Sequence, residues 1–295
     1  MVTYIAGNYL MDKGYLSKEQ LAFVLEERKK VRVKLGLIAV AEGMMMQMEA
    51  DEINQLQMVQ DKRFGDIAVE QGYLTEKEVD YLLMKQGNEY LTLAQTLEDN
   101  KLMTLEELEE HMLELTTENS WGMSGLEDLK SNDLNRILPL FIPDEAERYI
   151  DLAGIVLRMI VRRIDSNVYP LKAYLTNSFQ ANHYAMQSVE GQKVFSCAIA
   201  GMEDEVVILV EKFLHESFEK VDDDVLDAAA EIVNCMNGLY ASALSQAGVV
   251  MELLPPEYGT GPLEIQGEPL LVLPMVIQDK ILHVLISMGS QLKLQ

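Results

Sequence analysis

Residues 227 to 238 read DAAAEIVNCMNG, and this stretch decides how the second half of the chain folds. Its small and apolar residues predict a buried helix, yet Asp227, Glu231 and Asn234 recur at spacings of four and three. Positions i, i+4 and i+7 share one face of a helix, so these three side chains form a polar stripe. The stripe is either an ordinary solvated face or a surface that recognises a partner.

The helix that carries the stripe has clear end signals and lies among strand-like segments. Residues 222 to 224 are three aspartates, which are good N-caps, and Gly248 is a good terminator. Another helix is expected over about 144–164, and the segment 203–218 is ambiguous between helix and strand. Strands are predicted at LKAYLTN (171–177), YAMQSVEG (184–191), KVFSCAIAG (193–201), EPLLVLPMVI (268–277) and ILHVLISM (281–288). This order predicts an α+β domain with an antiparallel sheet and long helices.

The stripe also resembles a family motif. The arrangement Asp227-x3-Glu231-x2-Asn234, followed by Gly238 and later by two prolines at 255 and 256, resembles the CheC/CheX family of chemotaxis phosphatases over roughly residues 145 to 290. CheC-type members carry two such helices, whereas the helix expected at 144–164 has no Glu-x-x-Asn. The resemblance is therefore to CheX-like proteins with a single site, and it implies a homodimer.

The resemblance implies that Glu231 and Asn234 are catalytic, that Asp227 contributes to docking, and that the partner is a phosphorylated, CheY-like response regulator. Such regulators carry an aspartyl phosphate and their own Mg²⁺, and loss of the phosphate requires a water in line with the phosphorus. An asparagine amide can accept from and donate to that water, and a glutamate can pair with a regulator lysine. On this hypothesis the protein needs no metal or cofactor of its own. The alternative is a domain that keeps the fold without the activity.

The first third of the chain contains a repeat. Glycine pairs recur with a constant period of 29 residues, at Gly7/Gly14, Gly36/Gly43 and Gly65/Gly72. Capping boxes that start helices follow at Ser17 with Gln20 and Thr75 with Glu78, and a degenerate fourth copy without the glycine has Thr104 with Glu107. Each unit is predicted to be a tight glycine turn that leads into a helix of about three turns, which makes an all-helical repeat domain.

Two of these copies, residues 34–57 and 63–86, resemble the tandem motif of the GspE/MshE N-terminal domain of type II secretion and pilus assembly ATPases. The resemblance covers roughly residues 1 to 115, and some members of that family bind cyclic di-GMP through such a pair. Glycines let backbone N–H groups approach phosphates, and Arg or Lys can pair with phosphate or guanine. The implied ligand residues are Lys34, Leu35, Gly36, Gly43, Gln57, Arg63, Phe64, Gly65, Gly72 and Gln86. Alternatively, the repeats only pack helices and dock a protein partner.

The segment RKKVRVK, residues 28 to 34, holds five basic residues in a chain whose formal charge is −24. One interpretation is a solvated helix end, because the last turn of a helix favours positive charge. The other is an anion site beside Lys34.

Composition limits the remaining possibilities. A chain of 295 residues with 48% hydrophobic content predicts two domains, 1–115 and 144–295, joined by a linker at 116–143 that is rich in Gly, Ser and Asn and contains two prolines. No apolar window is long enough for a membrane span, and the N-terminus has no secretory signal, so we expect a cytoplasmic protein. The two cysteines fit a reducing compartment, and the four scattered histidines predict no zinc site. The negative charge disfavours nucleic acid as a partner.

These features together predict a two-component signalling protein. A helical repeat domain would serve as a sensory or regulatory module for a phosphatase-like domain that hydrolyses the aspartyl phosphate of a response regulator. Two alternatives remain open, a non-catalytic adaptor and a cyclic di-GMP receptor.

Overall fold

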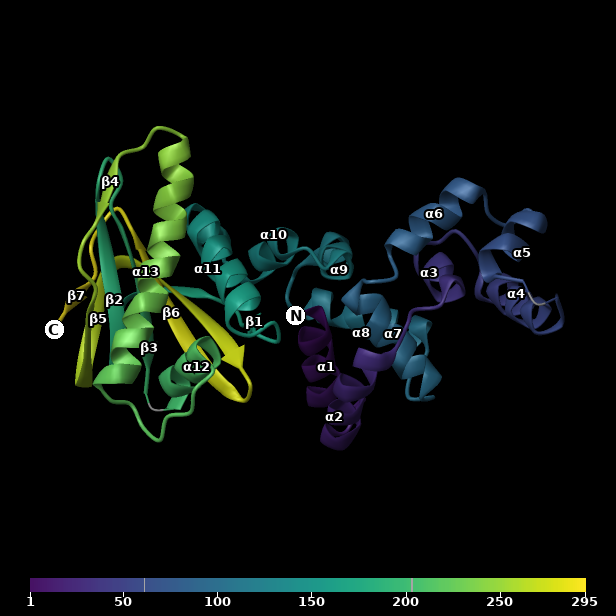
Figure 1. The fold of residues 1–295 in the computed structure, drawn as a ribbon, viewed down its shortest axis with the longest axis horizontal. Coiled ribbons are helices and arrows are strands. Elements are labelled where there is room, and N and C mark those ends of the chain that lie inside the picture. Colours follow the sequence, from purple (N-terminus) through teal and green to yellow (C-terminus); the bar gives the residue numbers. More distant parts are fainter. Residues whose placement is uncertain (61, 203) are drawn as a thin grey trace. The chain divides into compact units, whose positions relative to one another are not determined.

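The computed structural model describes residues 1–60, 62–202 and 204–295, and the chain divides into two compact units, Met1–Asp133 and Leu134–Gln295. The first unit is helical, and the second combines helices with an antiparallel sheet (Figure 1). Among the described residues, no helix combines the length and the apolar character that a membrane span requires.

The segment predicted as a linker, 116–143, is instead folded into short helices. It contains α9 (Gly122–Ser131), α10 (Leu134–Ile137) and the 3-10 helix η2 (Leu138–Phe141). Leucine and aromatic side chains of these helices are buried, so the segment belongs to the two units, whose boundary falls between residues 133 and 134. Several of the Gly, Ser and Asn residues that suggested a linker lie at helix ends, among them Asn119, Gly122 and Asn132, where such residues are also common.

The first unit is a series of helix pairs that confirms the predicted repeat. Its helices before α9 are α1 (Val2–Asp12), α2 (Lys18–Glu27), α3 (Leu35–Ala41), α4 (Gln47–Gln60), α5 (Phe64–Glu70), α6 (Glu76–Met84), α7 (Glu89–Asp99) and α8 (Leu105–Glu118), with a 3-10 turn η1 (Arg28–Lys30) after α2. All three predicted capping boxes are formed, at the starts of α2, α6 and α8. Each box satisfies backbone donors that the first turn of a helix leaves free.

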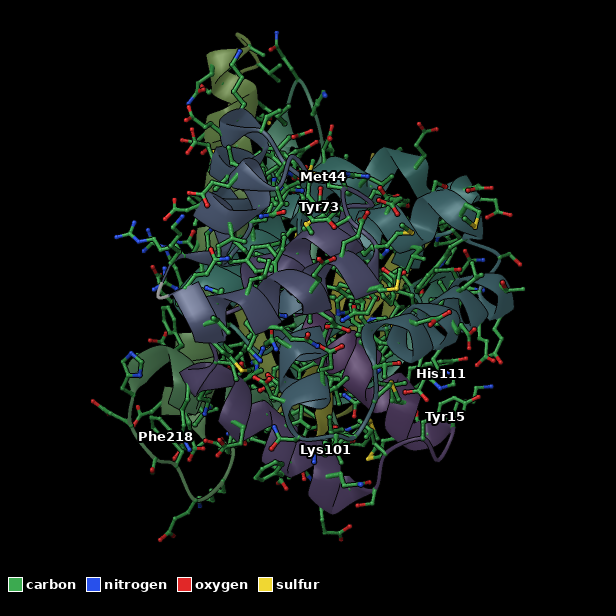
Figure 2. All side chains as sticks on the ribbon, turned by 90° about the vertical axis from the view of Figure 1, so that its right-hand side faces the viewer. Tyr15, Met44, Tyr73, Lys101, His111 and Phe218 are labelled. Atoms are coloured by element: carbon green, nitrogen blue, oxygen red, sulfur yellow. The ribbon has the colours of Figure 1, made fainter. Side chains whose placement is uncertain are left out.

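The two glycines of each repeat have different structural roles. A Cβ on the first glycine of a pair would lie 2.5 Å from Leu21, 3.0 Å from Phe64 or 2.8 Å from Val79, so this glycine allows close packing. The second glycine ends the helix in the left-handed region, with φ of +80, +67 and +77° in the three copies. Lys101 occupies the same position of the fourth copy, with φ 55°. Figure 2 labels it with the residues that follow the glycine in the other copies, Tyr15, Met44 and Tyr73.

The second unit contains the long helix predicted from the stripe. Its remaining helices are η3 (Asp144–Tyr149), α11 (Ile150–Arg163), α12 (Asp204–Leu214) and α13 (Asp223–Gln246). The backbone N–H of Val225 donates to Asp222 Oδ1 over 3.1 Å, which confirms the predicted cap of α13. The ambiguous segment forms α12, while its first residue, 203, lies outside the described residues.

The sheet is built around two long strands that run further than predicted. The strands are β1 (Tyr169–Pro170), β2 (Tyr174–Gly191), β3 (Phe195–Gly201), β4 (Met251–Leu253), β5 (Glu257–Ile277), β6 (Lys280–Met288) and β7 (Lys293–Leu294). Their order is β1-β5-β6-β3-β2-β4, with β7 beside β5. Because β5 also pairs with β2, the strands β2, β3, β6 and β5 form a closed circuit of antiparallel pairs.

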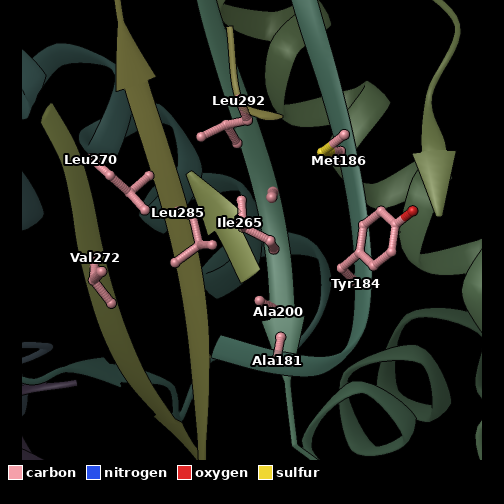
Figure 3. Packing of buried hydrophobic residues seen from close by; sticks show 10 residues of the cluster. Ala181, Tyr184, Met186, Ala200, Ile265, Leu270, Val272, Leu285 and Leu292 are labelled. Carbon is pink, nitrogen blue, oxygen red and sulfur yellow. The ribbon is translucent and has the colours of Figure 1, made fainter. Parts of the chain in front are cut away.

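The two faces of the sheet bury different side chains. Successive residues of a strand point to opposite faces, so Tyr184 and Met186 face one way and Gln187 the other. The face with Tyr184 holds a cluster made mostly of aliphatic residues, most of them labelled in Figure 3 (Ala181, Tyr184, Met186, Ala198, Ala200, Ile265, Leu270, Val272, Leu285 and Leu292). Helix α13 packs against β2 and β3, and α12 packs against β3 and β6.

Candidate functional site

The polar stripe lies on α13, whose apolar face is anchored to the sheet. The helix buries aliphatic side chains throughout its first three turns, among them Val225, Ala229 and Ile232. Asp227 and Glu231 are exposed, and Asn234 is half-buried. The structure therefore brings the predicted site residues onto one accessible face of a firmly packed helix.

Hydrogen-bonded side chains connect Asn234 to the sheet. Gln187 on β2 donates from Nε2 to Asn234 Oδ1 and to the backbone oxygen of Leu254, each over 2.9 Å. Asn237, one turn after Asn234, donates from Nδ2 to Gln187 Oε1 over 3.1 Å and to the backbone oxygen of Gln187 over 3.0 Å. Asn234 in turn donates from Nδ2 to Glu231 Oε2 over 3.3 Å. The four side chains therefore form one chain of hydrogen bonds in which each donates to the next. It runs from Asn237 in the core through Gln187 and Asn234 to the exposed carboxylate of Glu231.

The segment between α13 and the two prolines completes this network. Strand β4 pairs with the end of β2, and the N–H of Leu254 donates to the backbone oxygen of Ser188 over 3.0 Å. This pairing places the oxygen of Leu254 beside Gln187. Pro255 follows directly, and a proline has no N–H with which to continue the ladder. The number of residues between the stripe and the prolines thus determines that the backbone oxygen of Leu254 lies where Gln187 can donate to it.

Cys235 lies against the same carboxylate but is not a nucleophile. Its Sγ donates to Glu231 Oε1 over 3.8 Å. Burial raises the pKa of the Cys235 thiol above its ordinary value, and the negative charge of Glu231 raises it further. Because only the thiolate is reactive, this cysteine remains an inert thiol at neutral pH.

The sequence reasoning missed Gln187 and Asn237. Gln187 is 3% exposed and Asn237 is fully buried. One signal was available for Gln187, because it follows Ala185 and precedes Val189 on the same strand face, where an apolar residue is the rule. For Asn237 the signal was an asparagine three residues after Asn234, in the middle of an otherwise apolar run.

The first unit has a separate candidate site, a cavity of about 1570 Å³ between the second and third repeats. Seven of the ten residues predicted to bind a ligand line this cavity: Lys34, Leu35, Gln57, Arg63, Phe64, Gly65 and Gln86. Gly36 lines a smaller neighbouring cavity, whereas Gly43 and Gly72 line neither. Equivalent residues of two repeats, such as Lys34 and Arg63, therefore meet at one site.

The charges around this cavity are mixed. Arg32, Lys34 and Arg63 line it together with Asp66, Glu70, Glu76 and Asp80. Lys34 forms an ion pair with Asp99 over 2.6 Å, whereas Arg63 is exposed and pairs with no residue of the described chain. Gln86 is held by the oxygen of Val33, to which its Nε2 donates over 2.9 Å. Among the described residues, Arg63 and Arg32 are therefore the cations of this cavity that no carboxylate neutralises, and Arg32 contacts only the neutral Gln86 over 3.4 Å.

Different residues of the basic segment at 28–34 fit the two interpretations, a solvated helix end and an anion site. Lys29 and Lys30 pair with glutamates of their own helix end over 2.8 and 2.7 Å, as a solvated helix end would. Arg32 and Lys34, by contrast, line the cavity.

Comparisons with known proteins gave structural matches only. No family model matches the chain, the predicted GspE/MshE N-terminal resemblance included, and no curated protein matches it. The chain is similar to a CheC-like superfamily protein from Shewanella sp. PV-4, with 17% identity, coverage of 49% of this chain and 99% of that chain, and a TM-score of 0.42. It is also similar to the chemotaxis protein CheX from Desulfovibrio desulfuricans, with 17% identity, coverage of 48% and 99%, and a TM-score of 0.42. A chain of the CheX–CheY–BeF3–Mg²⁺ complex from Borrelia burgdorferi matches with 17% identity, coverage of 48% and 98%, and a TM-score of 0.37.

Proposed function

We propose that the second unit hydrolyses the aspartyl phosphate of a CheY-like response regulator, with Asn234 as the residue that positions water and Glu231 as the docking and orienting carboxylate. The observation that carries this proposal is the fixed amide of Asn234 beside the exposed carboxylate of Glu231. Its second support is the resemblance of the stripe at 227–238 to the CheC/CheX motif.

The chemistry needs a water in line with the phosphorus, and the regulator supplies the phosphate together with its own Mg²⁺. Asn234 has one amide hydrogen and one oxygen lone pair left after its bonds to Glu231 and Gln187. The water can accept from that N–H and donate to that oxygen or to Glu231. Holding the water in this way lowers the entropic part of the barrier without a general base.

The carboxylates of α13 suit a basic partner surface. Glu231 is exposed at the centre of the stripe, Asp227 lies one turn before it, and the helix begins with three further aspartates. A regulator lysine paired with Glu231 would fix the register in which the phosphate meets Asn234.

The alternative for this unit is an adaptor, in which the same face binds the regulator without catalysis. The two are separated by measuring phosphate release from a phosphorylated CheY-like regulator in the presence of Mg²⁺. Faster release with this protein supports the phosphatase, whereas binding without faster release supports the adaptor. We also predict a homodimer, which a measurement of the molecular mass of the protein in solution tests.

A second proposed function belongs to the first unit, as a receptor for cyclic di-GMP. The observation that favours it is that equivalent residues of two repeats, Lys34 with Arg63 and Gln57 with Gln86, line one cavity. A ligand with two phosphates and two guanines could engage such a repeated set. Calorimetry with cyclic di-GMP at low ionic strength tests this role. Absence of binding at high micromolar ligand would leave the repeats as a protein-docking module.

A further inference from the structure

The side chain of Gln187 makes three hydrogen bonds in the core of the second unit. It is 3% exposed, and both the donor and the acceptor atom of its amide are engaged. Its backbone oxygen also accepts from Asn237. A buried amide with every group engaged cannot rotate without leaving donors or acceptors unpaired, which is costly in the core.

We propose that Gln187 is a positioning residue for the dephosphorylation, because it sets which atoms of Asn234 face the attacking water. This inference rests on the proposed phosphatase function. Gln187 does not touch the reacting atoms, and it acts through its 2.9 Å hydrogen bond to Asn234 Oδ1.

Two backbone oxygens determine the orientation of every amide in the network. The oxygen of Leu254 can only accept, so the group of Gln187 that faces it must be Nε2, and the second hydrogen of Nε2 then reaches Asn234. The oxygen of Gln187 can also only accept, which turns Nδ2 of Asn237 towards it and towards Gln187 Oε1. Asn234 must therefore present Oδ1 to the core and Nδ2 to Glu231.

Asn237 stabilises the same arrangement of amides from within the core. It is fully buried, and both of the bonds described for its Nδ2 are donated to Gln187, one to Oε1 and one to the backbone oxygen. A buried amide that lost these bonds would leave donors unpaired in the core. Asn237 therefore helps to hold Gln187, the residue that orients Asn234.

The activity test compares Gln187→Met with the unaltered protein in phosphate release from a phosphorylated CheY-like regulator. Methionine has a similar length and no donor with which to hydrogen-bond to Asn234 Oδ1. We expect the maximal rate to fall by about 10-fold or more, with the half-saturating concentration changed only by a small factor. In an Asn234→Ala background, Gln187→Met should cause no further loss, because the residue through which it acts is absent. The matched control is Gln180→Leu on the same strand, which removes an exposed amide that donates to Glu264.

A second measurement does not depend on activity. ¹⁵N relaxation of the Asn234 side-chain amide in the unaltered protein, identified by its loss in Asn234→Ala, should show the order of a rigid group, unlike the exposed Asn167. In Gln187→Met the Asn234 amide should become mobile while the α13 backbone stays ordered. A mobile Asn234 amide in the unaltered protein, or an undiminished maximal rate in Gln187→Met, would overturn the inference. If the unaltered protein does not accelerate phosphate release from the regulator, the proposed phosphatase function is wrong. The relaxation of the Asn234 amide then tests by itself whether Gln187 orients Asn234.

Discussion

The side-chain amide of Gln187 on β2 donates to Asn234 Oδ1 on α13 over 2.9 Å, across 47 residues of sequence. This bond ties the exposed stripe to the centre of the sheet. A half-buried asparagine on a helix is ordinarily free to choose between rotamers, but here its amide is one link in a chain that ends at two backbone oxygens. The candidate catalytic group is therefore held before any partner arrives.

Glu231 is expected to contribute mainly to docking. Glu231→Ala should weaken binding of the regulator, and Glu231→Lys should weaken it by roughly a further 10-fold, because it places like charges against each other. Titration of the regulator against each variant measures the half-saturating concentration. Glu219→Lys changes the net charge equally at an exposed position that precedes α13 and is not part of the stripe, and it serves as the control. Equal affinities of the Ala and Lys variants would contradict the proposed ion pair.

The helix that carries the site was predictable because its signals are local. The aspartates before α13 and Gly248 after it gave limits of 222 and 248, and the helix spans Asp223–Gln246. The sequence marks Gln187 only as a polar residue on an apolar strand face and does not assign it to the site, because its partners lie on α13 and after β4, far away in sequence. The first half of β5, residues 257–267, is a strand although it contains three glycines and a proline, since it pairs with β2.

Lys101 offers a test of the fourth repeat. Its φ of 55° lies in the left-handed region, which is unfavourable for a residue with a Cβ. Lys101→Gly should therefore stabilise the protein by about 1 kcal/mol and raise the Tm by about 2 to 4 °C. The mirror variant, Gly72→Ala at φ +77°, should destabilise it by a similar amount. A lower Tm for Lys101→Gly would show that the fourth copy does not share the turn of the others.

The capping boxes predict a dependence of stability on pH. The pKa values of Glu78 and Glu107 are lowered, first because the backbone N–H of Thr75 or Thr104 donates to each carboxylate and then because the threonine hydroxyl does. A lowered pKa in the folded protein gives a stabilisation that is complete above the unfolded value of 4.5 and is lost as the pH falls through the folded value. Chemical denaturation at a series of acidic pH values should show this loss.

The double variant Glu78→Gln with Glu107→Gln is the matched comparison for that series. It keeps the shape of the boxes, as Gln20 does naturally beside Ser17, and removes the titrating groups. Its stability should fall less steeply with acid than that of the unaltered protein. Parallel curves would show that the two carboxylates do not stabilise the fold through their caps.

The cavity of the first unit predicts a binding defect in one arginine variant. If Arg63 pairs with a phosphate of cyclic di-GMP, Arg63→Ala should abolish binding measured by calorimetry while the Tm stays unchanged, and binding to the unaltered protein should weaken with salt. Lys29→Ala is the control, because it removes the same charge from a residue that pairs with Glu26 and does not line the cavity. Equal binding by Arg63→Ala would contradict the ion pair.

The period of 29 residues predicted the helical repeat correctly, but it could not separate glycines that serve a ligand from those that serve the fold. Gly43 and Gly72 end helices at positive φ and do not line the cavity. Gly36 and Gly65 face Phe64 and Val79 so closely that packing alone requires them. Of the four glycines only Gly65 lines the cavity, so side chains such as Arg63 and Gln86 are the better positions at which to test for a ligand.

The most direct test of the central claim is phosphate loss from a phosphorylated CheY-like regulator, with Mg²⁺, alone and with saturating amounts of the unaltered protein or Asn234→Ala. We predict that the unaltered protein accelerates the loss and that the variant reduces this acceleration by about 10²-fold or more while still binding the regulator. The reason is that Asn234 holds the water, whereas Glu231 and Asp227 hold the partner. Equal acceleration by Asn234→Ala, or no acceleration by the unaltered protein, would contradict the account.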